Sequence, residues 1–295
     1  YQDSEMEDNM IKVQLKDGSV REFEQGASVL DVANSISDGL ARAITGAKLN
    51  GAVVGTGHQI EEDSKLEFLT FEDADGKDIF WHTSTHIMAH AIKNLFPEAK
   101  LGTGPAVENG FYYDIDLDYR LTPEDLEKIE AEMKKIVKDE LEIERFELDE
   151  EAAVALMKER NEDYKIELIH DLSKEGQRLS FYRQGDFVDL CAGPHLSNTK
   201  KVKAFKLTSV AGAYWRADQS NKMLQRVYGI SFEKKKLLDE YLEMIEEAKK
   251  RDHRKLGKEL DLFTILEDGP GFPFFLPNGT VLKNELMKYW REVHR

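Results

Sequence analysis

Two short motifs, far apart in the sequence, carry the side chains that could do chemistry. The first is His82-Thr-Ser-Thr-His86, and the second is Cys191-Ala-Gly-Pro-His195, which contains the chain's only cysteine. On a helix, residues four apart share one face with about 5–6 Å between their Cβ atoms, so the first motif would present two imidazoles together. The second motif must form a turn, because glycine and proline interrupt regular structure. Three imidazoles and a thiol that converged could form a hydrolytic centre or a metal site.

Three chemistries compete if these four side chains converge. A metal ion bound by three imidazoles and one thiolate would be fully coordinated and therefore structural, unless one ligand gave way to water. A metal-free site would use the imidazoles to orient and deprotonate a water molecule, with Lys165 or Asp189 adjusting the charge. A nucleophilic Cys191 paired with His195 is the third arrangement. Each motif alone is weak evidence: Thr83, for example, stands where zinc-protease helices carry a glutamate.

The length of 295 residues is sufficient for two domains and a further partial one, and a composition of 41% hydrophobic and 33% charged residues is typical of a soluble protein with a hydrophobic core. No apolar run reaches the length of a membrane span, and the non-periodic opening at 1–5 resembles no secretory signal; it is expected to be a disordered end or a non-native remnant. A single cysteine excludes an intramolecular disulfide, so we expect a cytoplasmic location. The net charge of −16 argues against non-specific coating of nucleic acid, although 249–255 could form a local basic surface.

The elements that must position the motifs begin with a compact β-rich domain over 10–71. Apolar residues alternate with polar ones on either side of an Asp17-Gly18 hairpin turn. Ser28 and Asp31 have the types and spacing of a helix cap, and further strands follow. A hairpin, one helix and more strands in so short a segment predict a ubiquitin-like β-grasp fold.

Helices and strands predicted further along would hold both motifs. An apolar stripe predicts a helix over 82–96, after an acidic linker at 71–77. Thr122 and Pro123 have the types of an N-cap and a first helical residue, so another helix begins there. Residues 145–230 mix strands and helices and contain the second motif.

The C-terminal part predicts a long charged helix over 231–256. The following segment at 269–279 is too rich in glycine and proline to be helical, and a new helix begins near residue 280. The sequence ends inside this helix, and we therefore expect a further domain to be cut off.

Taken together, the motifs are highly specific and resemble those of bacterial threonyl-tRNA synthetase. Besides the two above, they are Gly104-Pro105, Gly110-Phe-Tyr-Tyr-Asp114, Asp189 before the cysteine, Ala211-Gly-Ala-Tyr-Trp-Arg216, Asn221-Lys-Met-Leu-Gln-Arg226 and Arg251-Asp-His-Arg-Lys255. The resemblance covers nearly the whole chain and implies an α+β fold with four parts. These are a β-grasp TGS domain at 8–71, an α+β editing domain of the threonyl/alanyl-tRNA synthetase type at 80–230, a linker helix at 231–256, and the truncated start of a class II catalytic core at 257–295.

The resemblance also implies which residues form an editing site. Tyr113 matches an aromatic residue near the terminal adenosine of tRNA, and the catalytic group falls on His82, His86, Lys165, Asp189, Cys191 and His195. Two positions depart from the family pattern: Ala192 stands where arginine is common, and Ala217 where glycine is usual.

Two properties of this site follow from its chemistry. We predict no metal ion in it, because four protein ligands would leave no open position for a catalytic water. His82 and Lys165 are expected to line a pocket that solvent reaches, so that replacing either would leave the fold intact.

The function implied is hydrolysis, by water attack, of serine wrongly attached to the 3′-terminal adenosine of tRNA(Thr). A synthetic site for threonine rejects serine only through one missing methyl group, worth about 1–3 kcal/mol, so a second, smaller pocket is needed. Full-length relatives ligate threonine to tRNA(Thr) in protein biosynthesis with ATP, magnesium and one zinc ion, and form homodimers. Those groups and the dimer contacts belong to a core largely absent here, so we expect no cofactor and no aminoacylation. An alternative is a zinc-dependent or inert tRNA-binding module.

Overall fold

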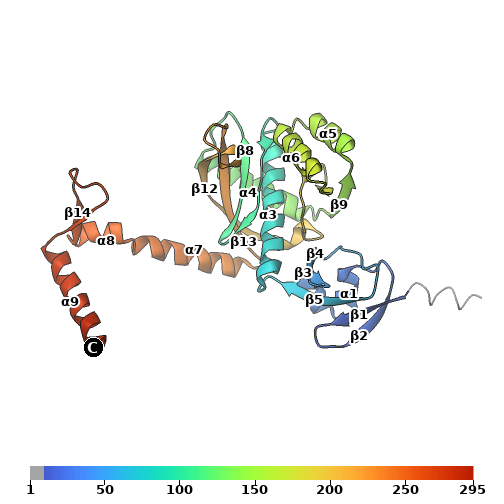
Figure 1. Ribbon diagram of the computed structural model, residues 1–295, viewed down its shortest axis with the longest axis horizontal. Helices are drawn as coiled ribbons and strands as arrows, with labels where there is room; N and C mark the ends of the chain where they lie inside the picture. The colour runs from blue at the N-terminus through green and yellow to red at the C-terminus, as the bar shows by residue number, and fades with distance from the viewer. Residues whose placement is uncertain (1–9, 295) are drawn as a thin grey trace, which may run out of the picture. The chain divides into compact units, whose positions relative to one another are not determined.

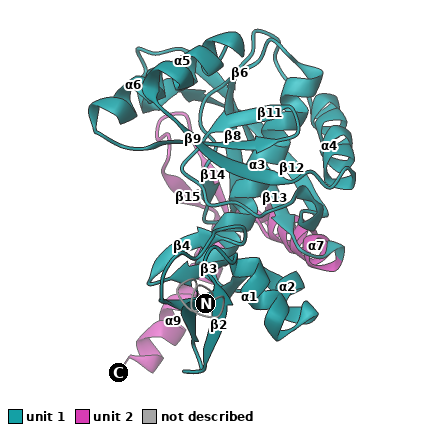
Figure 2. Cartoon of the chain, turned by 90° about the vertical axis from the view of Figure 1, so that its right-hand side faces the viewer, with its two compact units in different colours: residues 1–235 teal, residues 236–295 magenta. Residues whose placement is uncertain are grey.

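The computed structural model describes residues 10–294. This part of the chain divides into two compact units, one ending at Lys235 and the other beginning at Lys236 (Figure 2). The predicted domain start at residues 8 and 9, and the non-periodic opening at 1–5, lie outside the described residues.

The first domain of the larger unit is a mixed sheet with two short helices, in agreement with the predicted β-grasp fold (Figure 1). The strand order is β2-β1-β5-β3-β4; β1 and β5 are parallel, and the other three pairs of neighbouring strands are antiparallel. Alternation buries Ile11 and Val13, and Ser28 with Asp31 forms the predicted capping box. The elements are β1 (Met10–Leu15), β2 (Val20–Glu24), α1 (Val29–Ile36), α2 (Asp38–Ala43), β3 (Ile44–Leu49), β4 (Ala52–Gly55) and β5 (Ser64–Thr70).

The helix that carries the first motif, α3 (Ala74–Leu95), is longer than the sequence predicts. It begins at Ala74, so the end of the predicted linker 71–77 is its first turn. Asp73 accepts a hydrogen bond from the backbone N–H of Thr70 at 2.8 Å, and the acidic residues there lie at the positive end of the helix. From Ile79 to Ile92 every side chain except His82 is buried, because other elements surround the helix.

The second domain contains two sheets and three further helices around α3 (Figure 1). One sheet has the order β12-β13-β8-β6 with β7 also on β8, and the other has the order β11-β10-β9. The first half comprises β6 (Lys100–Leu101), β7 (Ala106–Val107), β8 (Gly110–Asp116), α4 (Pro123–Lys138), β9 (Ile143–Leu148), α5 (Glu150–Glu159) and α6 (Asp163–Lys174). The second half comprises β10 (Leu179–Gln184), β11 (Phe187–Leu190), the 3-10 turns η2 (Thr199–Lys201) and η3 (Trp215–Ala217), β12 (Ala204–Tyr214) and β13 (Met223–Phe232).

The predicted helix start at Thr122 and Pro123 is confirmed, with Thr122 as the N-cap of α4. The larger unit combines helices with separate, mostly antiparallel sheets, and the smaller unit combines helices with one antiparallel pair of strands, so the predicted α+β class is also confirmed.

The smaller unit differs from the predicted single helix over 231–256. That segment first completes β13 and then forms two helices, because Asp252 accepts a hydrogen bond from the backbone N–H of Arg254 at 2.7 Å and so caps a new helix. The final helix begins at Pro277, slightly before the predicted residue 280, with proline at its first turn. The elements are α7 (Lys235–Lys250), α8 (His253–Glu259), β14 (Phe263–Ile265), β15 (Pro273–Phe275) and α9 (Pro277–Val293).

Among the helices of residues 10–294, none has the combination of length and apolar character that crossing a bilayer requires.

Candidate active site

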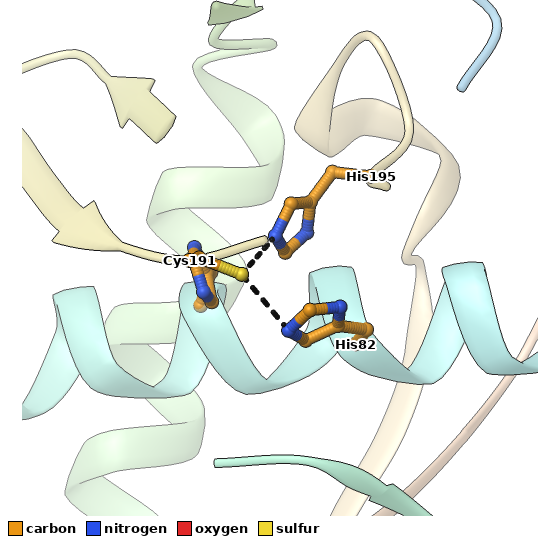
Figure 3. A group of neighbouring side chains, drawn as sticks. His82, Cys191 and His195 are labelled. Carbon is orange, nitrogen blue, oxygen red and sulfur yellow. Dashed lines mark hydrogen bonds between the residues drawn. The ribbon is translucent and has the colours of Figure 1, made fainter. Parts of the chain in front are cut away.

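The two sequence motifs meet in the second domain. His82 and His86 lie one turn apart on α3, while Cys191 and His195 lie in the loop after β11 (Figure 3). Cys191 Sγ is 3.2 Å from His82 Nε2 and 3.3 Å from His195 Nε2. The ring centroid of His86 is 4.1 Å from that of His195. Each of the four residues offers one metal-binding atom, and these atoms lie within 4.8 Å of one another.

The loop that presents Cys191 requires glycine at position 193. The φ angle of Gly193 is +72°, and a Cβ built there would lie 1.9 Å from Tyr182 Oη. The start of the loop is held against β10, where Ser180 Oγ donates to the Cys191 carbonyl at 2.7 Å, and the Gly193 N–H donates to Cys191 Sγ at 3.3 Å. Tyr182 packs edge-on against His195 with centroids 4.4 Å apart, so the tyrosine packs against both the middle and the end of the turn.

A second, fully buried group lies behind the imidazoles. Lys165 Nζ is 2.7 Å from Asp189 Oδ1, and Tyr113 Oη donates to Asp189 Oδ2 at 2.5 Å. Lys165 Nζ also donates to Tyr113 Oη at 3.0 Å, and His86 Nε2 lies 3.5 Å from Asp189 Oδ2. The structure thus brings all seven predicted site residues into one continuous network.

Two of these residues occupy surroundings that differ from the expectation. Lys165 is only 3% exposed, so it does not line a solvent-reached pocket. Tyr113 is 1% exposed beneath the loop at Gly104, and Asp189 and Lys165 engage its hydroxyl. Both side chains therefore hold Asp189 rather than face an open cavity, because β8, α6 and β11 enclose them.

Burial determines the protonation of the central group. It lowers the pKa of His82 to about 4 and of His86 to about 3, and it lowers the pKa of His195 well below its ordinary value. It also raises the pKa of the Cys191 thiol to about 12. At neutral pH the site therefore contains three neutral imidazoles and a protonated thiol.

The charge of Asp189 is maintained by its partners. Burial alone would raise the pKa of this carboxyl, but the Lys165 ammonium and then His86 outweigh that effect and hold the pKa below its ordinary value. Asp189 is thus a buried carboxylate paired with a buried ammonium.

Solvent reaches the site at His82. A cavity of about 300 Å³ is bounded by this histidine, by Pro194 of the second motif and by Pro105. Val53 of β4 also lines it, so the first domain contributes to the cavity wall. A substrate group that enters here would meet the His82 side of the four-residue group.

The sequence motifs missed two residues that shape the site. One is Thr83, which stands out in the sequence only because zinc-protease helices have a glutamate at that position; it contacts His195. The other is Tyr182, which packs against His195 and which no sequence pattern indicates. His90 extends the histidine stripe of α3, but it stacks on Phe187 and contacts Gln184 instead.

Comparison with known proteins identifies the two domains. The TGS domain family matches residues 11–70, and the threonyl and alanyl tRNA synthetase second additional domain matches residues 179–228. The chain therefore carries a TGS domain followed by a segment that matches the threonyl and alanyl tRNA synthetase second additional domain.

Two curated threonine–tRNA ligases are similar to nearly the whole of this chain. The chain is 68% identical to a threonine–tRNA ligase of Clostridioides difficile (strain 630) over 286 residues, and 61% identical to that of Acetivibrio thermocellus over 286 residues. Each match covers 97% of this chain, which spans 45% of the length of these relatives. The predicted resemblance to threonyl-tRNA synthetase is confirmed.

Proposed function

We propose that this chain is the editing part of a threonine–tRNA ligase and hydrolyses the ester of seryl-tRNA(Thr). The observation that supports the proposal is a neutral imidazole, His82, at the wall of a cavity of about 300 Å³, backed by two more neutral imidazoles and a protonated thiol. An aminoacyl ester is already activated, so its hydrolysis requires an oriented water, a proton acceptor and stabilisation of the oxyanion.

His82 and His86 orient the attacking water and the ribose hydroxyls in this mechanism. A water proton passes to an unprotonated imidazole as the water oxygen attacks the ester carbonyl, and the proton then goes to the leaving ribose oxygen. Serine and tRNA with a free terminal hydroxyl result, so no oxidant or further reactant is needed.

Lys165 stabilises the negative charge that develops on the ester oxygen through its field, because its ammonium is buried beside Asp189. Cys191 and His195 form the wall of the site. Tyr113, which the family resemblance places near the substrate, acts in this proposal by holding Asp189 and Lys165.

Selection against threonine follows from size. The synthetic site distinguishes the two amino acids by one methyl group, worth about 1–3 kcal/mol. A smaller editing pocket reverses this preference, since serine fits where the extra methyl group of threonine clashes. The partner is accordingly tRNA(Thr), through its 3′-terminal adenosine and the attached serine.

We also propose how the segments of this chain correspond to the domains of its longer relatives. Residues 8–71 serve as the TGS domain, 80–230 as the editing domain and 231–256 as a linker. Residues 257–295 begin a class II core that, with ATP, magnesium and zinc, ligates threonine and forms the homodimer. We propose a cytoplasmic location and no aminoacylation by the 295 residues alone.

A metal-bound site is the second candidate, because the four ligand atoms lie within 4.8 Å of one another. Three imidazoles and one thiolate suit tetrahedral zinc, which would be held by His82, His86, Cys191 and His195 and would serve a structural role. We propose the metal-free form, since complete coordination would leave the water without an open position. One zinc per chain by elemental analysis, with deacylation lost to chelators, would establish the alternative.

The decisive experiment compares the hydrolysis of seryl-tRNA(Thr) and threonyl-tRNA(Thr) by the 295-residue chain under single-turnover conditions. We expect the seryl ester to be cleaved at least about tenfold faster than the threonyl ester, because a difference of one methyl group provides discrimination of about this size. Equal rates would refute the size selection, and no hydrolysis of either ester by folded protein would indicate a binding module.

A further inference from the structure

Thr83 lies between the two histidines of the first motif and is fully buried. Its hydroxyl has three neighbours. Oγ1 donates to the Ile79 carbonyl at 2.9 Å, accepts from the backbone N–H of Leu196 at 2.9 Å, and lies 3.3 Å from His195 Nδ1. The helix and the Cys191–His195 loop therefore meet at one hydroxyl group.

The hydrogen bonds of the Thr83 hydroxyl determine which ring nitrogen of His195 carries a hydrogen. A threonine hydroxyl has one proton to donate and two lone pairs that accept. The proton is used by the shorter contact to Ile79, and the Leu196 N–H occupies one lone pair. The remaining lone pair faces His195 Nδ1, which must therefore carry a hydrogen. We infer that Thr83 is a positioning residue that holds neutral His195 in the tautomer protonated on Nδ1.

This tautomer directs the thiol proton. His195 Nε2 is then an acceptor, and it lies 3.3 Å from Cys191 Sγ (Figure 3). The sulfur accepts the Gly193 N–H, and its own S–H group can donate to the unprotonated Nε2 of His195. Cys191 thus donates to His195, and His195 donates to Thr83, so the hydrogen bonds of this relay all point in the same direction.

The relay matters for His82. The other ring nitrogen at the sulfur is His82 Nε2, which lies 3.2 Å from Cys191 Sγ. In the tautomer of His82 that is protonated on Nδ1, Nε2 is unprotonated. The single thiol proton is engaged by His195, which leaves the Nε2 lone pair of His82 available to water at the cavity.

The opposite tautomer would disable this base. A hydrogen on His195 Nε2 would point at Cys191 Sγ, and the thiol proton would turn to His82 Nε2, the other acceptor at the sulfur. Thr83 therefore determines which imidazole serves as general base. This consequence for catalysis rests on the proposed deacylase function, whereas the tautomer itself does not.

The chain offers a matched control on the same helix. Ser84 is also fully buried, and its hydroxyl donates to the Phe80 carbonyl at 2.9 Å and contacts Ser231 Oγ at 2.7 Å. Replacing Ser84 removes a buried hydroxyl group from α3 but changes no hydrogen bond to a histidine.

The test records the ¹⁵N–¹H correlation spectrum of the imidazoles in chelator-treated wild-type chain and in Thr83→Val, Thr83→Ser and Ser84→Ala. We expect His195 to be protonated on Nδ1 in the wild type, in Thr83→Ser and in Ser84→Ala, and to shift toward the Nε2-protonated form in Thr83→Val. Seryl-tRNA(Thr) hydrolysis should fall about 10²-fold in Thr83→Val, the lower end of what a positioned general base contributes, and should be retained in the other two.

Two results would overturn the inference. One is a wild-type His195 protonated on Nε2, which decides the matter even if Thr83→Val does not fold. The other is a folded Thr83→Val that keeps the Nδ1-protonated form. A wild-type chain that shows the expected tautomer but hydrolyses no ester would refute the proposed function and leave the tautomer assignment standing.

Discussion

Replacing Lys165 tests whether the buried ion pair holds the site together. The ammonium and the Asp189 carboxylate are 2.7 Å apart and 3% and 2% exposed, so neither is solvated by bulk water. Lys165→Met keeps most of the side-chain volume and removes the charge. Removing one partner of a buried pair costs about 3–5 kcal/mol, because the other charge remains uncompensated. For a chain of this size, 1 kcal/mol changes the melting temperature by about 2–4 °C, so we expect a decrease of about 6–20 °C at pH 7.

The pH dependence of this loss identifies its cause. In the wild type the pKa of Asp189 is below its ordinary value, so the carboxylate contributes stability at pH values above about 4 and loses it as the pH falls through the folded-state pKa. In the Lys165→Met variant, burial would raise the pKa of Asp189. The variant would therefore lose stability as the pH rises through this raised pKa. The difference in the free energy of unfolding should therefore be largest at neutral pH and should shrink on acidification toward about pH 4.

The assay is urea denaturation of both proteins at several pH values, with Lys165→Met/Asp189→Asn as the control that removes both charges. The double variant should recover part of the lost stability, because no unpaired charge remains. A Lys165→Met variant as stable as the wild type at pH 7, or a loss that does not change with pH, would refute the reasoning.

Three further predictions concern the catalytic group and its loop. Burial lowers the pKa of His82 to about 4, so single-turnover deacylation should be constant from neutral pH down to about pH 5 and fall only as His82 takes up a proton; a half-maximal rate near pH 6.5, the ordinary value for histidine, would contradict this. Cys191→Ala should retain more activity than His82→Ala, since water attacks the ester; isolation of a seryl thioester would require a covalent mechanism instead. Gly193→Ala should lower both the melting temperature and the rate, because a Cβ would lie 1.9 Å from Tyr182 Oη at a φ of +72°. Gly176→Ala, at φ +70° with no atom within 4 Å, is the matched control, and equal effects of the two substitutions would exclude the clash.

Local patterns predicted the elements whose causes are local. The β-grasp domain followed from alternation around Ile11 and Val13, and the capping box of Ser28 and Asp31 forms within a single helical turn. Element ends were less predictable where packing decides them. α3 extends back to Ala74 because its early apolar residues are buried, and a side-chain cap at Asp252 divides what reads as one helix.

The sequence by itself determined the chemical inventory of the site: two imidazoles one helical turn apart, and a cysteine and a third imidazole on a turn that contains glycine and proline. Their meeting could be inferred from family resemblance but not from spacing, because contacts such as that between His82 and Cys191 join residues more than a hundred positions apart. Only the tertiary structure decided that burial keeps the histidines neutral, that Lys165 lies inside an ion pair, and that Thr83 faces His195. These properties depend on which side chains of other elements exclude water and supply hydrogen-bond partners, and packing sets both.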